Sequence, residues 1–553
     1  MTEQLKSVHD RYADAEIQSF YEQGFWQPTS FYGLVRAQAD KTPDAPFLVD
    51  VAHTLSYRGF ADKVVRLAAG LKRAGLQPGE RIAAQLPNWA EFPLLAVAAS
   101  RIGAITVPIM PIYRGDEVGY VLEHSGASFA VTCGTFKGFD HAGMFADLVE
   151  KIPNVRRLFV VKGDDDAPGT SFDSLCVDGE IAELETEIGA DSSPDDGFLI
   201  VYTSGTTSRP KGCFHSFNTV RASAAAIGQS LAYTSADVQF GPSPITHSTG
   251  LVTSVLLPLL YGAKSYLMES WDPVKGLEII GEHGCTAAVT ATPFLQMLMD
   301  AYDAEKHDAS SLRLWVCAGS PIPGSVVERA RLLLSGCQTL SLYGRSENFL
   351  TTMCTVNDDP ARSASSDGSA LLGAAVKIVD SDGNEVAVGE EGDIAYRGPS
   401  HMIEYFRNDA ETAALFTPDG FSRSGDLGRM DADGFVRVTG RLKDIVIRGG
   451  MNISARELEE HLLSHQGIAN VAIVGMPDER LGEKVCAYVV PADQGSELTL
   501  EEITGYLKEH NVATQKLPER LEHIDALPMT ATGKVQKHVL RAAIAAKLAA
   551  NQN

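Results

Sequence analysis

Alternating strand-like and helix-like segments constrain the fold of this chain more than any other feature. Between Phe47 and Pro108, the strand-like run FLVDV precedes a segment whose apolar residues recur at helical spacing, YRGFADKVVRLAAGLKRAG. The runs RIAAQL, EFPLLAVAASRIG and AITVPI repeat this order, and a similar rhythm returns from Phe198 to about Tyr343. Such alternation is typical of layered α/β domains, so we predict that architecture for the amino-terminal part of the chain.

The last third of the chain has a different pattern. Across Val376–Val438, short strand-like runs are separated by turn pairs at Asp382-Gly383 and Asp433-Gly434, which predicts a β-rich subdomain. Further on, VAIVG and KVCAYVV read as strands, and capping boxes that begin at Ser454 and Thr499 predict the starts of two helices. This pattern predicts a small α+β unit at the end of the chain.

The length and these patterns together predict the domain organisation. A chain of 553 residues is too long for one hydrophobic core. We predict an α/β protein whose large amino-terminal domain, residues 1–441, combines layered α/β subdomains with the β-rich subdomain. Residues 442–444 would form a hinge, and residues 445–553 would form the small α+β domain.

Composition and charge narrow the kinds of partner. The formal net charge is -24 and the pI is near 5.0, which argues against nucleic acid or an anionic membrane as the main partner. The longest apolar stretch, Leu251–Tyr261, is too short to span a bilayer. The first residues are polar and mixed in charge, unlike a signal peptide, and the scattered cysteines form no CxxC pair. We therefore expect a cytoplasmic protein with buried thiols and no membrane span.

A polar loop follows a predicted buried strand. Phe198–Tyr202 reads FLIVY, and TSGTTSRPKG follows at once. Hydroxyl donors, glycines that allow close backbone approach and a lysine together suit a phosphate. These residues are Thr203, Ser204, Gly205, Thr206, Thr207, Lys211 and Gly212. The loop is not a Walker A motif, because Pro210 replaces the second glycine and Gly212 stands where the magnesium-binding Ser/Thr should be.

Four further motifs follow in order along the chain. Tyr343-Gly344-Arg345-Ser346-Glu347 combines an aromatic face, which suits a purine, with a hard carboxylate, which suits magnesium. Ser424-Gly425-Asp426-Leu427 supplies a carboxylate that can accept hydrogen bonds from two hydroxyl groups. Gly440-Arg441-Leu442-Lys443-Asp444 and Thr530-Ala531-Thr532-Gly533-Lys534 complete the series.

Together the five motifs resemble the signatures of the adenylate-forming superfamily, which includes acyl-CoA synthetases, carrier-linked adenylation domains and beetle luciferases. The resemblance covers about Phe31 to Arg541, and the first thirty residues lie outside it. It implies that the protein binds ATP and Mg²⁺ and activates a carboxylic acid as an acyl-AMP. It also implies that the small carboxyl-terminal domain is mobile and rotates about a hinge at Asp444.

The resemblance assigns a role to each matching residue. Catalysis would depend on Lys534, Lys211 and Glu347. The metal would be bound by Thr206 and Glu347. The loop residues that would hold ATP are Thr203, Ser204, Gly205, Thr206, Thr207 and Lys211. Further contacts to the nucleotide would come from Gly319, Ser320, Tyr343, Gly344, Ser346, Asp426 and Arg441.

The resemblance also gives some of these residues finer roles. Tyr343 would stack on adenine, Asp426 would accept hydrogen bonds from both ribose hydroxyls, and Ser346 replaces the family's threonine but keeps its hydroxyl. Gly450 matches the glycine that lets the pantetheine arm of CoA pass, and any Cβ would narrow such a tunnel. The acid would contact His247, Thr249, Gly319 and Phe349.

Two observations narrow the class of acid. Amino-acid adenylation domains usually carry an aspartate for the α-ammonium group near His247, and Pro242–His247 holds no acidic residue. We therefore predict an acid other than an amino acid. The candidate wall residues are mostly apolar or small: Ile245, Thr249, Val316, Gly319, Ser320, Phe349 and Leu350. They predict a hydrophobic acid, which would be aryl, alicyclic or medium-chain.

The leading hypothesis is an AMP-forming acyl-CoA ligase that uses ATP, Mg²⁺ and CoA. The alternative acceptor is an acyl carrier protein, which would be a separate protein. Two hypotheses from other functional classes are a non-catalytic homologue that binds acyl-AMP or CoA and a phosphotransferase that makes ADP. The sequence leaves open whether the protein is a monomer or a homodimer.

Overall fold

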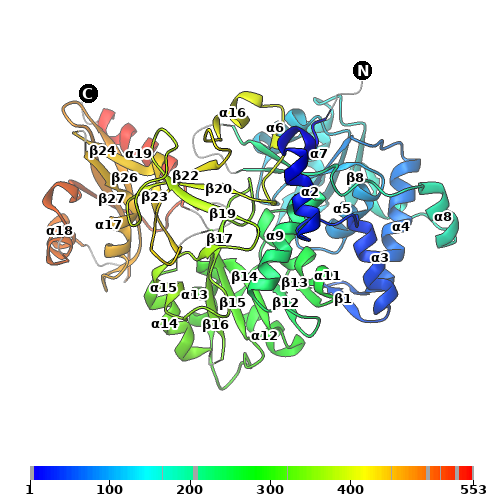
Figure 1. Ribbon diagram of the computed structural model, residues 1–553, viewed down its shortest axis with the longest axis horizontal. Helices are drawn as coiled ribbons and strands as arrows, with labels where there is room; N and C mark the ends of the chain where they lie inside the picture. Colours follow the sequence, from blue (N-terminus) through cyan, green and yellow to red (C-terminus); the bar gives the residue numbers. More distant parts are fainter. Residues whose placement is uncertain are drawn as a thin grey trace. The chain divides into compact units, whose positions relative to one another are not determined.

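The computed structural model describes residues 5–164, 166–203, 209–319, 322–334, 336–449, 451–492, 498–510, 512–529 and 535–550. The chain packs into two compact units (Figure 1). The first comprises Met1–Thr203, Pro210–Ala375 and Arg397–Ala414, and the second comprises Ser204–Arg209, Val376–Tyr396 and Leu415–Asn553. The β-rich region and the carboxyl-terminal region therefore pack within one unit.

Two large sheets form the framework of the first unit. The spatial order of the first sheet is β18 (Ser369–Ala370), β17 (Thr352–Met353), β16 (Gln338–Tyr343), β15 (Leu314–Ala318), β14 (Ala287–Ala291), β12 (Val238–Gly241), β13 (Lys264–Leu267), β1 (Pro46–Val49) and β2 (Thr54–Ser56). The order of the second is β21 (Glu404–Tyr405), β11 (Gly212–Ser216), β10 (Gly197–Tyr202), β4 (Ile105–Pro108), β3 (Arg81–Gln85), β5 (Phe129–Cys133), β8 (Arg157–Val161) and β9 (Thr170–Ser171). The central strands of both sheets are parallel.

Helices connect these strands, because parallel neighbours need a crossover. The longer helices of this unit include α3 (Phe31–Lys41), α4 (Tyr57–Arg73), α5 (Glu91–Arg101), α6 (Gly115–Ser125), α7 (His141–Val149), α8 (Ile181–Ile188), α9 (Phe217–Ser230), α12 (Pro273–His283), α13 (Thr292–Ala301) and α14 (Gly324–Leu333). The short helices include α10 (Ser248–Gly250), α11 (Leu257–Tyr261) and α15 (Arg362–Ser365).

The hydrophobic core shows that both faces of each sheet are covered. In β3, Ile82 joins one buried cluster and its neighbour Ala83 joins another. In β15, Val316 joins the first cluster and Trp315 joins a third cluster with residues of α12, α13 and α14. Successive side chains of a strand point to opposite faces, so burial of both faces explains the continuous apolar runs in the sequence.

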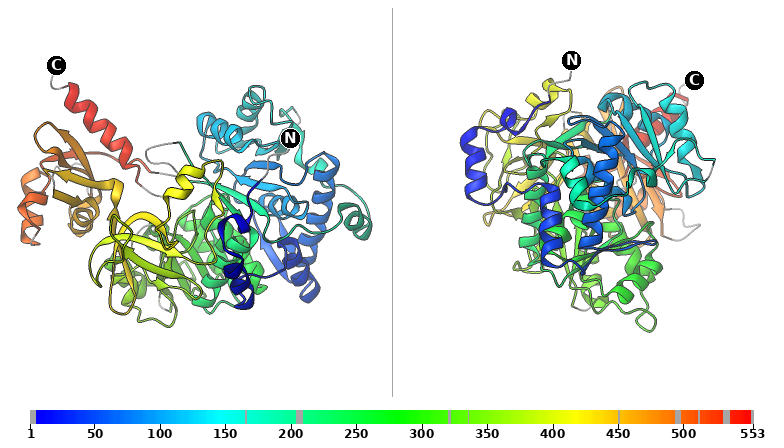
Figure 2. Two further views of the ribbon diagram at one scale, coloured as in Figure 1. Left: turned by 45° about the horizontal axis from the view of Figure 1, so that its top comes forward. Right: turned by 90° about the vertical axis from the view of Figure 1, so that its right-hand side faces the viewer.

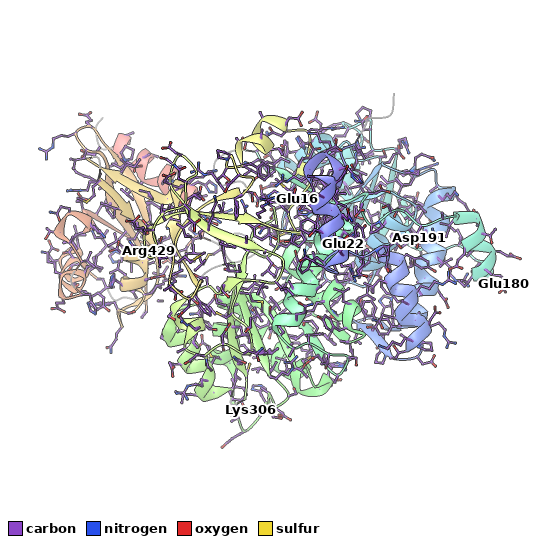
Figure 3. All side chains as sticks on the ribbon, viewed as in Figure 1. Glu16, Glu22, Glu180, Asp191, Lys306 and Arg429 are labelled. Carbon is purple, nitrogen blue, oxygen red and sulfur yellow. The ribbon has the colours of Figure 1, made fainter. Side chains whose placement is uncertain are left out.

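The amino-terminal arm is part of the first unit. It contains α1 (Val8–Arg11) and α2 (Asp14–Glu22), which Figure 2 shows in dark blue beside the yellow segment that carries α16 (Asp409–Ala414). Trp26 is wholly buried, and its indole N–H donates to the carbonyl oxygen of Pro399 at 2.9 Å. Glu16, labelled in Figure 3, pairs with Arg397 at 2.7 Å.

The second unit contains an antiparallel sheet and an α+β region. The antiparallel sheet has the order β19 (Ala375–Val379), β20 (Gly392–Arg397), β22 (Ser422–Met430) and β23 (Val436–Arg441). The sheet of the α+β region contains β25 (Met451–Ser454), β24 (Ile445–Arg448), β27 (Gly482–Pro491), β26 (Ile468–Asp478) and β28 (Arg520–His523). One face of β26 and β27 packs on α17 (Ala455–Leu462) and α18 (Leu500–Glu509), and the other packs on α19 (Lys537–Ala550).

The predicted fold class, α/β with a β-rich part and a small α+β part, is confirmed. The helix predicted after FLVDV is α4, and Ser56 caps its first turn by accepting a hydrogen bond from Gly59. Asp433-Gly434 turns the chain between β22 and β23, and Gly434 has a φ of 82°, which glycine adopts readily. Thr499 caps α18 as predicted. Among the described residues, no helix is long and apolar enough to cross a membrane.

Candidate functional site

The parallel strands of the first sheet bring several predicted site residues to one edge. Tyr343 is the last residue of β16, and Gly319 directly follows β15, which pairs with β16 in parallel register. The segment that contains His247 and Thr249 follows β12 in the same parallel array. Ligands of α/β proteins bind outside the carboxyl ends of such strands, so this edge is the candidate site of the first unit.

The loop after β16 is tightly packed against its own backbone. A Cβ on Gly344 would lie 1.9 Å from the carbonyl oxygen of Phe349, so only glycine fits there. Phe349 has a φ of 50°, which is uncommon for a bulky residue, and its side chain is largely buried. The backbone N–H of Met402 donates to the carbonyl oxygen of Glu347 at 2.7 Å. These contacts fix the course of the loop that carries Glu347.

A buried histidine also contacts the loop after β16. His215, on β11, lies 2.8 Å from the carbonyl oxygen of Ser346 through Nε2, and its ring centroid is 4.4 Å from that of Phe349. Burial lowers the pKa of His215 to about 3, so the ring is neutral at ordinary pH. A carbonyl oxygen can only accept a hydrogen bond, and Nε2 therefore carries the hydrogen.

Tyr405 contacts both Glu347 and Lys211, the carboxylate and the lysine that the sequence predicts for this site. Its phenol O–H donates to Oε1 of Glu347 at 2.5 Å, and the ammonium group of Lys211 lies 4.4 Å from its ring centroid. Lys211 also pairs with Oε2 of Glu411 at 2.5 Å. Burial first, and the Glu347 carboxylate second, raise the pKa of Tyr405, so its phenol stays protonated and remains a donor.

The predicted phosphate loop joins β10 to β11. The backbone N–H of Thr203 donates to the carbonyl oxygen of Lys211 at 2.9 Å, and the Lys211 N–H lies 3.2 Å from the Thr203 hydroxyl. The strand predicted at Phe198–Tyr202 is observed as β10. A strand, not a helix, follows the loop, which agrees with the absence of a Walker A motif in the sequence.

In the second unit, Asp426 and Arg441 face each other on β22 and β23. The Arg441 guanidinium donates to Oδ1 of Asp426 at 2.7 Å, and the Asp426 side chain is largely buried. The backbone N–H of Gly425 donates to Oδ1 of Asp393 at 2.9 Å, which holds the turn before Asp426. Asp444 pairs with Arg541 of α19 at 3.1 Å.

The remaining predicted residues form three sets: residues at the start of α10, wall candidates in the core, and residues outside the described part of the chain. His247 is the residue before α10, and its Nδ1 accepts from the backbone N–H of Thr249 at 3.4 Å. The wall candidates Ile245 and Val316 are wholly buried in the core of the first unit. Seven predicted site residues lie outside the described part of the chain: Ser204, Gly205, Thr206, Thr207, Ser320, Gly450 and Lys534.

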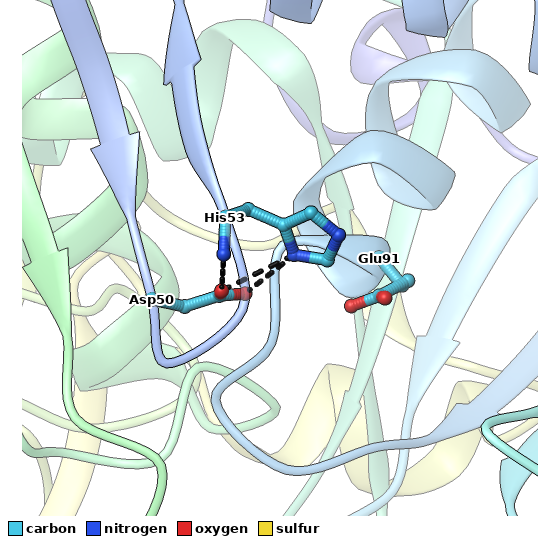
Figure 4. A group of neighbouring side chains, drawn as sticks. All are labelled: Asp50, His53 and Glu91. Carbon is cyan, nitrogen blue, oxygen red and sulfur yellow. Dashed lines mark hydrogen bonds and ion pairs between the residues drawn. The ribbon is translucent and has the colours of Figure 1, made fainter.

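A separate group of potential ligands lies near α5. Asp50, His53 and Glu91 bring ligand atoms within 4.8 Å of one another (Figure 4). Oδ1 of Asp50 accepts the backbone N–H groups of Ala52 and His53, and Oδ2 accepts that of Ala90. The carboxylate of Asp50 therefore fastens the β1–β2 turn to the start of α5, and we interpret the group as structural.

Three residues of this site were not predicted from the sequence. Tyr405 contacts Glu347 across 58 positions of the chain, and nothing in the local pattern around it marks that contact. His215 lies in the apolar run GCFHS, where a histidine is commonly a core residue. Glu411 lies on a short exposed helix, and its contact with Lys211 sets it apart from an ordinary surface carboxylate.

Comparison with known proteins gives matches along almost the whole chain. The model of the AMP-binding enzyme family matches residues 35–406, and that of the AMP-binding enzyme C-terminal domain matches residues 457–534. The medium-chain fatty-acid–CoA ligase of Escherichia coli is 35% identical over 532 residues, which are 96% of this chain and 93% of that protein. The salicyl-AMP ligase / salicyl-S-ArCP synthetase of Mycobacterium tuberculosis is 33% identical over 94% of this chain and 92% of its own length.

A solved structure agrees with these matches. The crystal structure of ATP-bound MatB from Rhodopseudomonas palustris superposes with a TM-score of 0.84 at 26% identity. The superposition covers 94% of this chain and 99% of MatB. The likeness therefore extends over both compact units.

Proposed function

Because the chain belongs to the AMP-binding family of adenylate-forming enzymes, we propose that it activates a hydrophobic carboxylic acid as an acyl-AMP and transfers the acyl group to CoA. The geometric observation that best supports the proposal is that Lys211 and Glu347 both contact Tyr405 in the first unit. A lysine suits phosphate oxygens, and a carboxylate suits a hard divalent cation.

In the first step, a carboxylate oxygen of the acid attacks the α-phosphorus of ATP, and the bond to pyrophosphate breaks. Two anions must meet, so charge neutralisation dominates the barrier. Lys211 and Lys534 would supply positive charge near the phosphates. The half-buried carboxylate of Glu347 has the oxygen donors that Mg²⁺ prefers, and Mg²⁺ bound there would offset the phosphate charge.

Other residues would orient the nucleotide. Tyr343 would stack on the adenine, and Asp426 would accept hydrogen bonds from the ribose hydroxyls while Arg441 holds its Oδ1. The hydroxyl groups of the loop after β10 would hold the β- and γ-phosphates. Orientation of this kind converts an encounter of two reactants into a reaction within one complex.

In the second step, the CoA sulfur attacks the acyl carbon, AMP leaves, and the thiol proton passes to a base or to solvent. We propose Asp444 as the hinge between the two half-reactions, and Gly450 as the residue that the pantetheine arm passes. The neighbouring Gly449 has a φ of 58°, a left-handed conformation that glycine adopts readily.

The acid is proposed to be medium-chain, alicyclic or aryl. The segment Pro242–His247 has no acidic residue for an ammonium group, and the residues around it are apolar or small. The named relatives act on a medium-chain fatty acid and on salicylate, which fits this range. The free cysteines among the described residues fit a reducing compartment, and we propose the cytoplasm.

An acyl carrier protein is the second candidate acceptor, because one relative is a salicyl-S-ArCP synthetase. The two acceptors can be distinguished by incubating the protein with ATP, Mg²⁺ and acid, with and without CoA. Conversion of acyl-AMP to acyl-CoA would support CoA as the acceptor. Acyl-AMP that persists in the presence of CoA would favour the carrier protein.

The proposed catalytic role of Lys534 can be tested by measuring the two half-reactions separately. Lys534→Ala should lower acid-dependent exchange of pyrophosphate into ATP by about 10²–10⁴-fold, because it removes charge stabilisation from the first transition state. The same variant should still form thioester from supplied acyl-AMP. Equal loss of both half-reactions would contradict the role given to Lys534, and an exchange reaction driven best by amino acids would contradict the class of acid.

A further inference from the structure

We propose that Tyr405 is a positioning residue for the ATP-binding side of the first unit: it holds the carboxylate of Glu347 and the ammonium group of Lys211 in their working orientations. The proposal rests on the proposed function, because it takes Glu347 as the Mg²⁺ ligand and Lys211 as a phosphate ligand. It gives a role to a side chain that no motif of the sequence singles out.

The hydroxyl group of Tyr405 fixes one oxygen of Glu347. Its hydrogen bond to Oε1 is 2.5 Å long, and Tyr405 as a whole residue is 3% exposed. Hydrogen bonds to charged groups are stronger than neutral ones, and they strengthen further where water is excluded. A carboxylate has four lone-pair positions, so it can accept this bond and still bind a cation. The phenol therefore orients the carboxylate without using up its capacity for a metal.

The ring of Tyr405 contacts Lys211. The Lys211 ammonium group lies 4.4 Å from the ring centroid, within the range of a cation–π contact. Lys211 also pairs with Glu411, whose side chain is about half exposed. An exposed ion pair is weak, so phosphate can replace Glu411 as the partner of the ammonium group while the ring contact remains.

Backbone hydrogen bonds hold Tyr405 in place relative to both Lys211 and Glu347. It lies on β21, where its backbone pairs with Cys213 of β11, two residues after Lys211. Its backbone N–H donates to the hydroxyl of Thr412 at 2.9 Å. Three residues earlier, Met402 donates its N–H to the carbonyl oxygen of Glu347. The strand thus fixes the tyrosine relative to the loops of both Lys211 and Glu347.

The amino-terminal arm braces the segment that leads into β21. The hydroxyl of Tyr12 donates to the carbonyl oxygens of His401 and Gly398, at 2.9 and 3.2 Å, and Trp26 donates to that of Pro399. Lys6 pairs with Glu404, the neighbour of Tyr405, at 2.7 Å. The arm therefore stabilises the backbone from which Tyr405 reaches Glu347.

The test variant is Tyr405→Phe, which removes the hydroxyl and keeps the ring. The matched control is Tyr57→Phe, because Tyr57 is a wholly buried tyrosine of the same unit whose hydroxyl donates to the carbonyl oxygen of Ala263 at 2.8 Å. The reference is Glu347→Gln, which removes the proposed metal ligand. Thermal unfolding of each variant shows whether it is folded.

Two readouts separate positioning from general stability. One is the affinity for Mn²⁺ with α,β-methylene-ATP, measured by calorimetry without turnover. The other is the Mg²⁺ concentration that gives half-maximal pyrophosphate exchange at fixed ATP. We expect Tyr405→Phe to weaken metal–nucleotide binding and to raise the Mg²⁺ requirement by about tenfold or more, with an unchanged KM for the acid. Tyr57→Phe should leave both quantities at the wild-type value.

The outcomes distinguish failure of this inference from failure of the proposed function. If Tyr405→Phe behaves as Tyr57→Phe while Glu347→Gln loses metal–nucleotide binding, Tyr405 has no positioning role and the proposed function stands. If Glu347→Gln also binds the metal–nucleotide complex normally, the metal assignment beneath both proposals is wrong. A rise in the KM for the acid equal to the rise in Mg²⁺ requirement would also overturn the positioning role.

Discussion

The need for the observed course of the loop after β16 can be tested by adding one methyl group at Gly344. A Cβ at this position would lie 1.9 Å from the carbonyl oxygen of Phe349 and 2.7 Å from its carbonyl carbon. Real Cβ atoms essentially never approach other heavy atoms within 3.0 Å, so the loop must move by about 1 Å. The obstructing atoms are backbone, and no side-chain rotation can relieve the contact. The displacement therefore falls on the segment that carries Glu347.

The expected magnitude follows from this displacement. Misplacement of a reacting or positioning group by about 1 Å lowers rates roughly 100-fold, which corresponds to about 2.7 kcal/mol. We expect Gly344→Ala to lower acid-dependent pyrophosphate–ATP exchange by about that factor. The exchange rate is measured at saturating ATP and acid, and circular dichroism during heating shows that the variant remains folded.

A control glycine separates this effect from the substitution itself. Gly115 begins α6 in the same unit, its φ is not positive, and an added Cβ would meet no atom within 4 Å. Gly115→Ala should exchange pyrophosphate at the wild-type rate. If folded Gly344→Ala retained more than half of the wild-type exchange rate, the loop would not need its observed course for activity.

Three other substitutions have expected outcomes. Because the pKa of His215 is about 3 in the folded chain and near 6.5 when unfolded, stability is lost as pH falls below 6.5, by about 2 kcal/mol at pH 5. Urea unfolding at pH 7 and pH 5 should show that loss reduced in His215→Asn, and an equal loss in both proteins would contradict the burial argument. Trp26→Ala should cost about 3–5 kcal/mol of unfolding free energy, and a cost below about 1 kcal/mol would mean that the arm is not part of the core. Glu411→Gln should tighten ATP binding by up to about fivefold by releasing Lys211, whereas weaker binding in calorimetry would show that Glu411 helps to place Lys211.

Local patterns in the sequence predicted much of the secondary structure. The helical period of apolar residues from Tyr57 onward gave α4, and the apolar run FLIVY gave β10. The motif order suggested the adenylate-forming superfamily, and the family models confirm that resemblance over residues 35–406 and 457–534. These features depend on neighbouring residues or on a recognisable order of motifs, so they can be read from one chain.

Contacts between distant residues could not be predicted in this way. The hydrogen bond from Tyr405 to Glu347 and the bond from Trp26 to Pro399 join residues 58 and 373 positions apart. Neither pair has a spacing or a charge pattern that marks it, because the pairing is created by the sheet order and by the path of the arm. The contact of His215 with the loop after β16 could not be predicted either. A histidine within the apolar run of β11 is commonly an ordinary buried core residue.

Formation of an acyl-AMP is tested most directly by following the oxygen atoms of the acid. The protein is incubated with ATP, Mg²⁺, CoA and an acid labelled with ¹⁸O in both carboxylate oxygens, with octanoate, cyclohexanecarboxylate and benzoate as the first choices. Formation of an acyl-AMP places one labelled oxygen between carbon and phosphorus, and attack by the CoA sulfur leaves that oxygen on AMP. We expect AMP with one ¹⁸O atom and an acyl-CoA that retains the other. Unlabelled AMP, or ADP with labelled phosphate, would contradict this expectation.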